Sequence, residues 1–442
     1  MRRGDLVEVV VGDISFPNIG LARIGDRLLE IKGGLPGQRL RVRITRKGRR
    51  NLGRIVEVLQ TAPQEISAEC AVFGDCGGCA FQNIPYEYEI ELKTYMVKKI
   101  FAPYNMEDKF LASVPSPARG YRNKMEYSFG DDGADGNLTL GMRKKGSYYE
   151  AVDASGCLLP HADFGRIVAE TVEYFRAKGA TFYHRKKDSG TLRHLVIRHG
   201  VTSGEILVNL VTKGGDDYAE FAKMLLEIPL ENKIIGILHT INDSLADAIV
   251  PNSVKTLHGR DFFHEMGYKI PAFSFFQTNS GMTEYLYATI AEFAGDLRDR
   301  TIFDLYCGAG TIAQFLARRG AKRVVGVEID EAAVSCAREN AANLGNCEFI
   351  AGDVKQVVKD LAEKPDIIVL DPPREGIVPK AIPDILAFNA QKIIYVSCKP
   401  TSLAANLPAF LDGGYEVAQI QCIDMFPRTA NVEVVCALVR KG

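Results

Sequence analysis

The chain has 442 residues, of which 46% are hydrophobic and 25% are charged, and its formal net charge is −1. This length exceeds that of a usual single domain, so we expect two or three domains with buried cores. The stretch from Met1 to Val11 has no long apolar run, which excludes a signal peptide or membrane span there. We therefore expect a cytoplasmic protein with no membrane partner, whose ten cysteines are thiols rather than disulfides.

Charge is unevenly distributed along the chain. Residues 1–60 hold 13 Lys and Arg but 6 Asp and Glu, a local net charge of +7, which leaves −8 for the rest. A basic module joined to an acidic body favours contact between that module and a polyanion. A solvated charged face would give the same counts, so charge alone leaves both interpretations open.

Residues 1–60 also have the pattern of short strands. Apolar residues alternate over 7–11 and again over 40–44, and a glycine-rich turn at 33–37 lies between them. Several short strands broken by glycine predict a small β-barrel. Basic side chains gather on and after the second alternating segment, and we interpret them as a phosphate-binding face. They are Arg41, Arg43, Arg46, Lys47, Arg49 and Arg50.

A cysteine cluster follows within residues 61–82, and a fourth cysteine lies farther along the chain. The four residues are Cys70, Cys76, Cys79 and Cys157. Four thiolates can hold either zinc or an iron–sulfur cluster, and the spacing alone leaves this choice open. Gly77 and Gly78 would let backbone amides approach the sulfur atoms. Beyond the cluster we predict a helix over 86–101 and a mixture of strands and helices over 120–270.

From about residue 300, predicted strands alternate with helices. The strands are Thr301–Tyr306, Arg323–Val327, Glu348–Ile350, Ile367–Leu370 and Ile393–Val396. Such alternation is typical of a doubly wound, Rossmann-like α/β sheet. The predicted fold class is therefore α/β, with a small N-terminal β-barrel and a mixed α+β middle. In doubly wound sheets, ligands bind outside the carboxyl ends of the strands.

The first of these strands ends in a glycine turn, Gly308-Ala309-Gly310. Glycines there let the backbone approach a ligand, and Glu328, at the end of the second strand, can accept hydrogen bonds from ribose hydroxyls. The third glycine of a dinucleotide fingerprint is missing, which favours S-adenosylmethionine, a ligand without a pyrophosphate. Asp353 follows another strand and could reach the adenine. The alternative to a cofactor site is a tight structural turn with acidic side chains on the surface.

A rigid turn ends the next strand, at Asp371-Pro372-Pro373, because two prolines force extended backbone. Base-modifying methyltransferases hold the base in such a turn. Those that act on exocyclic amines usually follow the prolines with an aromatic side chain that stacks on the base. Arg374 stands at that place, which disfavours the amine reaction.

A cysteine, Cys398, reaches the same edge of the predicted sheet. We expect the adjacent Lys399 to favour the thiolate, although a cysteine at a strand end is more often a packing residue. Carbon 5 of uracil needs such a nucleophile, because it can attack a methyl donor only after a thiolate adds to carbon 6. A base must then remove the carbon 5 proton, and Glu433, before an apolar strand, is the candidate.

Together these residues resemble the RNA 5-methyluridine methyltransferase family, over nearly the whole chain. The segment Phe276-Gln277-Thr278-Asn279 is similar to the family's cofactor-contacting segment, which implies that Gln277 contacts S-adenosylmethionine. Cys398 matches the family's nucleophile and Glu433 its general base. Five residues match its other cofactor positions: Tyr306, Thr311, Glu328, Asp353 and Asp371.

The resemblance also bears on the cysteines and the barrel. In the family the four cysteine positions hold a [4Fe-4S] cluster, which implies a cluster rather than zinc. Residues 1–60 resemble the RNA-binding TRAM domain, which the transfer-RNA enzymes of many bacteria lack. This implies 23S ribosomal RNA as the substrate, with transfer RNA as the alternative. The implied division has a central domain over 61–268 and a methyltransferase domain over 269–442. As departures, many members have His at Arg428 and Asn at Lys399.

Two other functions compete with this interpretation. An amine methyltransferase would use the Asp-Pro-Pro turn, but it would not need Cys398. A non-catalytic RNA-binding or iron–sulfur scaffold would need neither the glycine turn nor Glu433. The sequence implies RNA as a partner and implies no protein partner.

Overall fold

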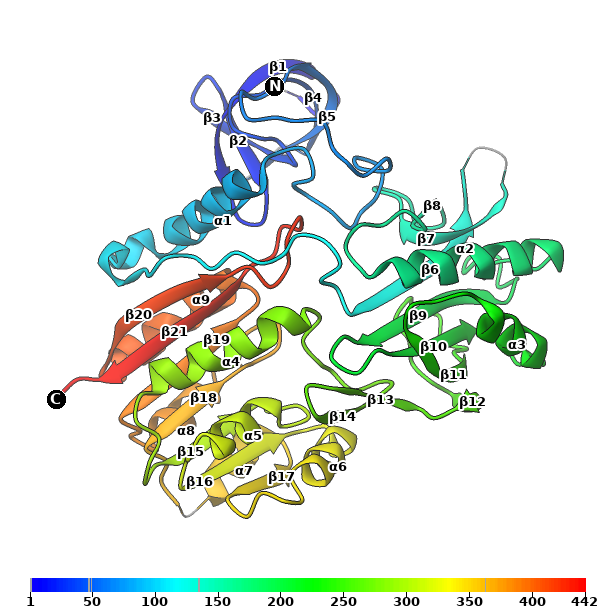
Figure 1. Ribbon diagram of the computed structural model, residues 1–442. Helices are drawn as coiled ribbons and strands as arrows, with labels where there is room; N and C mark the ends of the chain where they lie inside the picture. Colours follow the sequence, from blue (N-terminus) through cyan, green and yellow to red (C-terminus); the bar gives the residue numbers. More distant parts are fainter. Residues whose placement is uncertain (1, 47, 49, 134–135, 362) are drawn as a thin grey trace.

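The structure is a computed structural model that describes residues 2–46, 48, 50–133, 136–361 and 363–442. A small barrel lies above two larger sheets, one formed by the middle of the chain and one by its C-terminal part (Figure 1). Lys47 and Arg49 of the expected phosphate-binding face lie outside the described residues. Within the described chain, no helix combines the length and apolar character that crossing a membrane requires.

The N-terminal strands form a closed barrel, as the alternating sequence predicts. The strands are β1 (Leu6–Ser15), β2 (Ile19–Ile24), β3 (Arg27–Lys32), β4 (Arg39–Arg46) and β5 (Asn51–Gln60), joined in the order β1-β2-β3-β5-β4. Leu40, Val42 and Ile44 of β4 fill the interior and are at most 1% exposed. Successive side chains of a strand point to opposite faces, so the arginines between them face outward.

The outward arginines of the barrel are partly neutralised by acidic side chains. Arg39 and Arg41 both pair with Glu8, at 2.8 and 3.1 Å, and Arg41 also pairs with Glu57. The expected phosphate-binding face is therefore a mixed-charge surface around Arg41. A phosphate would have to compete there with two carboxylates.

The middle of the chain forms a seven-stranded sheet in the order β12-β11-β10-β9-β6-β7-β8. Its strands are β6 (Lys124–Asp131), β7 (Leu138–Arg143), β8 (Ala151–Asp153), β9 (Leu192–Gly200), β10 (Glu205–Thr212), β11 (Lys233–Ile241) and β12 (Ser253–Gly259). Two helices, α2 (Ala162–Ala177) and α3 (Ala219–Glu227), pack on this sheet through Phe164, Phe175 and Phe221. A hairpin of β13 (Phe262–Glu265) and β14 (Tyr268–Pro271) packs on β9 and β10.

The C-terminal part forms a doubly wound sheet in the order β17-β16-β15-β18-β19-β21-β20, which confirms the predicted fold class. Its strands are β15 (Thr301–Leu305), β16 (Arg323–Glu328), β17 (Cys347–Ala351), β18 (Ile367–Leu370), β19 (Lys392–Ser397), β20 (Tyr415–Ile423) and β21 (Glu433–Arg440). The strands β15 to β19 are parallel, whereas β21 is antiparallel to both of its neighbours.

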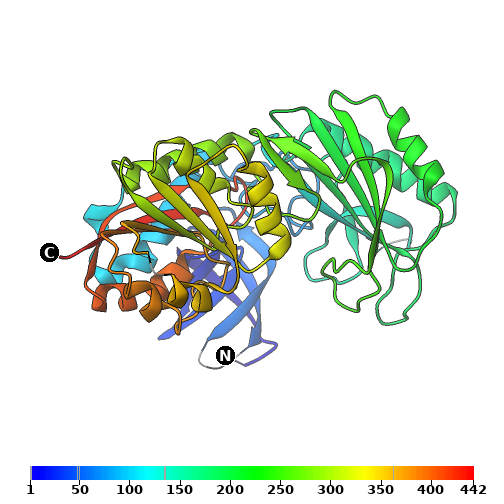
Figure 2. The same ribbon diagram turned by 90° about the horizontal axis from the view of Figure 1, so that it is seen from below.

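Helices cover both faces of this sheet, as Figure 2 shows. They are α4 (Ser280–Ala294), α5 (Thr311–Arg318), α6 (Glu331–Asn340), α7 (Val354–Asp360), α8 (Ile382–Leu386) and α9 (Pro400–Asp412). Every residue of β15 is buried, because its side chains alternate between two hydrophobic clusters on opposite faces. Ile302 belongs to one cluster, and Phe303 and Leu305 belong to the other.

A helix at the predicted bounds, α1 (Tyr86–Phe101), connects the barrel with the C-terminal sheet. Acidic residues in its first turn and lysines in its last turn complement the helix dipole. Met96 packs with residues under the barrel, whereas Val97 and Phe101 belong to the core of the C-terminal sheet. Two short 3₁₀ turns follow, Ala102–Tyr104 and Glu107–Lys109.

The chain after α1 stays on the C-terminal sheet before it enters the central one. Leu111 donates its backbone N–H to Ile420, and Val114 donates its own to Cys422, so this segment lies beside β20. Residues 86–114 therefore pack with the C-terminal part, although the sequence analysis places them in the central domain. The domain limits themselves stay a prediction.

Candidate active site

The glycine turn, Glu328, Asp371 and Cys398 meet at one edge of the C-terminal sheet. The turn follows β15, Glu328 ends β16, Asp371 follows β18 and Cys398 follows β19. These four strands are parallel and adjacent, so their carboxyl ends lie side by side. This is the edge at which doubly wound sheets bind ligands.

The glycine turn combines close packing with an open side. Tyr306, Gly308 and Gly310 all have left-handed backbone, with φ of 69°, 52° and 70°. A Cβ atom on Gly310 would lie 2.3 Å from the ring of Phe349, so only glycine fits there. A Cβ on Gly308 would meet nothing within 4 Å. Gly310 thus serves packing, while the backbone at Gly308 borders space that a ligand can fill.

Glu328 is fixed by backbone donors. One carboxylate oxygen accepts the N–H of Gly308 at 3.0 Å, and the other accepts those of Ile329 at 2.8 Å and Asp330 at 3.0 Å. These bonds tie the glycine turn to the end of β16. The carboxylate is half-buried, so it retains a side that can face ribose hydroxyls.

The other expected cofactor residues border the same turn. Burial, followed by the charge of Asp353, raises the pKa of Tyr306 to about 12, so these two side chains lie near each other. Asp353 also caps α7 by accepting the N–H of Lys355 at 3.0 Å. The hydroxyl of Thr311 lies 2.7 Å from that of Tyr287.

The segment that contains Gln277 is held by distant parts of the chain. Gln277 is buried, and its carbonyl accepts the side-chain amide of Asn123 at 2.9 Å. Asn279 caps α4 and donates to Ser116 at 2.9 Å and to the carbonyl of Met425 at 3.2 Å. Asn279 was not predicted as a helix cap, although an Asn before an apolar helical run is a recognisable N-cap signal.

The thiol of Cys398 is surrounded mainly by acidic groups. Burial, together with the charges of Glu433 and Asp371, raises the pKa of Cys398 to about 11. Arg374 is the cation that opposes this effect. We expected Lys399 to favour the thiolate; that expectation is wrong for this arrangement, in which the thiol pKa is raised and the acting cation is Arg374.

The carboxyl groups near Cys398 are poorly solvated. Burial raises the pKa of Asp371 to about 7. Burial and the charge of Asp371 raise the pKa of Glu433 well above its ordinary value, while Arg374 lowers it. One carboxyl oxygen of Glu433 is buried without a hydrogen-bond partner in the described chain. Asp304 is buried beside them, which also raises its pKa, and sequence reasoning missed it because its strand has an ordinary pattern.

Arg374 is itself held in place from two sides. Its guanidinium donates to the side chain of Asn431 at 3.1 Å, and its carbonyl accepts the hydroxyl of Ser402 at 2.7 Å. Asn431 lies two residues before Glu433. Arg374 therefore connects the Asp-Pro-Pro turn with the segment that ends in Glu433, a role that its place after the prolines did not predict.

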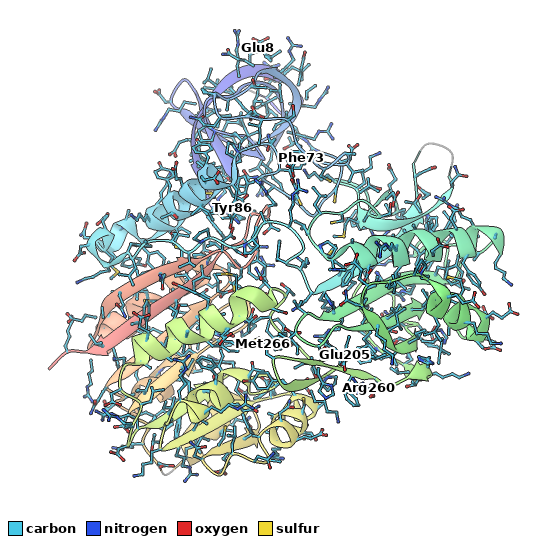
Figure 3. All side chains as sticks on the ribbon, in the orientation of Figure 1. Glu8, Phe73, Tyr86, Glu205, Arg260 and Met266 are labelled. Carbon is cyan, nitrogen blue, oxygen red and sulfur yellow. The ribbon has the colours of Figure 1, made fainter. Side chains whose placement is uncertain are left out.

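The loop before Glu433, residues 424–432, is fastened to α1 by a buried ion network. The ammonium of Lys93 lies 2.8 Å from carboxylate oxygens of both Glu89 and Asp424, and all three side chains are at most 2% exposed. Lys93 also donates to the carbonyl of Phe426 at 3.1 Å. Tyr86, which Figure 3 labels between the barrel and the C-terminal sheet, donates to Asp424 at 2.9 Å.

The same loop is also fastened to the segment after the cysteines. Arg428 has left-handed backbone, donates its N–H to Glu89 at 2.7 Å, and donates from its guanidinium to the carbonyl of Ile84 at 2.9 Å. Its own carbonyl accepts the N–H of Ala80, next to Cys79, at 2.8 Å. Arg428, which stands where many family members have His, thus links its own loop to α1 and to the segment after the cysteines.

The four clustered cysteines influence one another. Burial, together with the other three thiols, raises the pKa of Cys79 to about 12. The N–H of Gly78 donates to the sulfur of Cys76 at 3.3 Å, as the glycines suggested. Among the residues that the structure describes, no group of three or more His, Cys, Asp or Glu is arranged to hold a metal ion. The iron–sulfur cluster stays a prediction.

Known proteins resemble the whole chain. Residues 203–441 match the family described as tRNA (Uracil-5-)-methyltransferase. An uncharacterized RNA methyltransferase of Clostridium tetani is 43% identical over 100% of this chain and 99% of its own length. Another, of Caldanaerobacter subterraneus subsp. tengcongensis, is 42% identical over 98% of this chain and 99% of its own.

A solved structure of a uracil-5 methyltransferase also resembles this chain. The Pyrococcus abyssi tRNA (uracil-54, C5)-methyltransferase, in complex with S-adenosyl-L-homocysteine, is 26% identical with a TM-score of 0.78. The match covers 98% of this chain and 100% of that one. The chain belongs to the tRNA (uracil-5-)-methyltransferase family and is an RNA (uracil-5-)-methyltransferase.

Proposed function

We propose that the protein methylates carbon 5 of an RNA uridine with Cys398 as the nucleophile and Glu433 as the general base. The observation that carries this proposal is the meeting of a thiol, a buried carboxyl group and the glycine turn at one sheet edge. An amine methyltransferase would need neither Cys398 nor Glu433. The methyltransferase domain, 269–442, supplies all of these groups in this proposal.

S-adenosylmethionine supplies the methyl group from its sulfonium centre. The open side of Gly308 fits such a ligand, because the backbone there faces space rather than side chains. Glu328 would accept the ribose hydroxyls, and Asp353 would lie toward the adenine. The remaining proposed contacts come from Gln277, Tyr306, Gly310, Thr311 and Asp371.

In the first step, the sulfur of Cys398 bonds to carbon 6 of the uracil. The electron pair of the double bond between carbons 5 and 6 moves toward the carbonyl oxygen, which makes carbon 5 nucleophilic. The thiol has a pKa of about 11, so it must first pass its proton to a neighbouring base. The carboxylate of Asp371 is the available acceptor, because Glu433 must stay deprotonated to take the carbon 5 proton in the last step.

In the last step, Glu433 takes the proton from the newly methylated carbon 5. The electrons of that bond restore the double bond, and the bond between carbon 6 and sulfur breaks, so Cys398 leaves as a thiolate. Burial suits Glu433 to this task, because a carboxylate with a raised pKa is a stronger base than an exposed one.

A [4Fe-4S] cluster on Cys70, Cys76, Cys79 and Cys157 is also part of this proposal. Four cysteine thiolates are the ligand set that such a cluster would take. The mutual influence of the four thiols supports the cluster. Its role would be structural, since methyl transfer moves no electron to or from it.

The RNA class has two candidates. The barrel, read as a TRAM domain, favours 23S ribosomal RNA. The Pyrococcus abyssi transfer-RNA enzyme, however, matches 98% of this chain, so its match includes most of the barrel residues. This observation supports transfer RNA as the second candidate. If a transfer-RNA enzyme also matches the barrel residues, the barrel does not distinguish a ribosomal substrate from a transfer-RNA substrate.

Tritium release from RNA labelled at uridine carbon 5 tests the proposal. Protein purified without oxygen would be assayed with S-adenosylmethionine on ribosomal and transfer RNA separately, beside Cys398→Ala. We expect release by the wild type only, and the RNA that reacts identifies the substrate class. If neither RNA releases tritium although the protein binds S-adenosylhomocysteine, the carbon 5 reaction is wrong.

A further inference from the structure

Two loops of the central part carry exposed cations and an exposed aromatic ring. One loop lies between β7 and β8 and contains Lys145 and Tyr148, whose exposed fraction is 86%. The other precedes β9 and contains Arg185, Lys186 and Lys187, all exposed. We call these five residues the loop patch.

The two loops pack together and reach the cysteine segment. The rings of Tyr149 and His184 stack with centroids 3.9 Å apart and planes 14° apart, which joins one loop to the other. The ammonium of Lys145 lies 5.3 Å from the ring centre of Phe73, and its backbone N–H donates to Asp75 at 2.7 Å. Figure 3 labels Phe73 between the barrel and the central part, so the loop patch begins near the barrel.

The carboxylates nearby are already paired with other cations. Glu150 pairs with Lys144 at 2.7 Å, and Asp188 pairs with Lys213. Asp247 lies 3.5 Å from a guanidinium nitrogen of Arg143. Within the part of the chain that the structure describes, the four cations of the loop patch have no carboxylate partner. They form a positive surface without internal neutralisation, unlike Arg39 and Arg41 of the barrel.

We propose that the loop patch binds a single-stranded segment of the RNA substrate, away from the methylated uridine. Cations without carboxylate partners suit phosphates, and a ring exposed like that of Tyr148 suits stacking on an unpaired base. A duplex would offer phosphates but no free base face to the ring. This inference rests on the proposed function, since it names a second contact of the same RNA.

The first test is the salt dependence of RNA binding by a variant with Arg185→Gln, Lys186→Gln and Lys187→Gln. Losing three contacts to single-stranded phosphates should lower the slope of log K against log salt concentration by about 2. Tyr148→Ala should weaken binding about fivefold to 100-fold. Both variants should keep the wild-type kcat at saturating RNA.

A matched control removes three exposed lysines on α3, β11 and β12, at the other end of the central sheet: Lys223→Gln, Lys233→Gln and Lys255→Gln. Its charge change is equal, and its salt slope should stay at the wild-type value. If the patch variants bind RNA as the wild type and this control do, the inference is wrong, and the patch serves an acidic protein or no partner. Failure of the proposed function would look different, since the wild type itself would release no tritium.

Discussion

Cys398 and Glu433 face each other one residue beyond the last pair of an antiparallel ladder. The register of β19 and β21 pairs Ser397 with Val434, and continuing it by one step brings Cys398 to Glu433. The charge of Glu433 raises the pKa of Cys398, as expected for two acids at this spacing. Removing the charge of Glu433 should therefore lower the pKa of Cys398.

Replacing Glu433 with Gln should trap the enzyme on its RNA. The amide cannot remove the carbon 5 proton, so turnover should fall about 10²-fold to 10⁴-fold. The thiol should add more readily, because loss of the Glu433 charge lowers the pKa of Cys398. A denaturing gel should show a covalent protein–RNA band that requires S-adenosylmethionine for its stable, methylated form. The double variant with Cys398→Ala should give no band, and a band there would assign the bond to another residue.

The rate should rise with pH, and Arg374 should set the pH range over which it rises. Cys398, Glu433 and Asp371 all have raised pKa values, so each must lose a proton that it holds at lower pH. Arg374→Gln removes the charge that lowers the thiol pKa, so the pKa of Cys398 should rise further. Each added pKa unit should cost about tenfold in thiolate at neutral pH. Measuring kcat/KM from about pH 6 to about pH 9 would show an alkaline shift.

Arg374→Lys is the control for that shift, because it retains the positive charge. It should lose the hydrogen bond to Asn431 but keep most of the pH profile. If Lys and Gln shift the profile equally, Arg374 acts through its contact with Asn431 and not through its charge.

The ion network under the loop 424–432 should stabilise the fold. Lys93→Met leaves the buried carboxylates of Glu89 and Asp424 without their cation, which should lower the free energy of unfolding by about 3–5 kcal/mol. Lys98, an exposed lysine of the same helix, is the control. Lys98→Met should change the free energy of unfolding by about 0.5 kcal/mol or less. Urea denaturation of both variants measures this difference. Equal losses would mean that the network contributes no more than a surface charge.

The sequence pattern predicted the sheet edge well because that edge depends on local signals. Strands, a glycine turn and the Asp-Pro-Pro turn are short-range features, and parallel strands bring their ends together. The bounds of α1 also follow from its periodicity and flanking proline. The local signal did not show that α1 packs on the C-terminal sheet, since this depends on residues such as Asp424, 331 positions from Lys93.

The charge around Cys398 was mispredicted for a related reason. Lys399 is its neighbour in sequence, but adjacent side chains at a strand end point different ways. The groups that act on the thiol come from the turn after β18 and from β21. Burial, which dominates all of these pKa shifts, depends on the complete fold and has no short sequence signal.

The two glycines of the cofactor turn should respond differently to alanine. Gly310→Ala places a Cβ 2.3 Å from Phe349 in left-handed backbone, so it should destabilise the protein by about 1–3 kcal/mol. Gly308→Ala meets no atom within 4 Å, so its stability cost should be only that of the backbone, about 1 kcal/mol. Its Cβ would instead enter the space proposed for S-adenosylmethionine. Calorimetry with S-adenosylhomocysteine should therefore show weaker binding by a well-folded Gly308→Ala protein. Unchanged affinity in that variant would place the ligand elsewhere along the sheet edge.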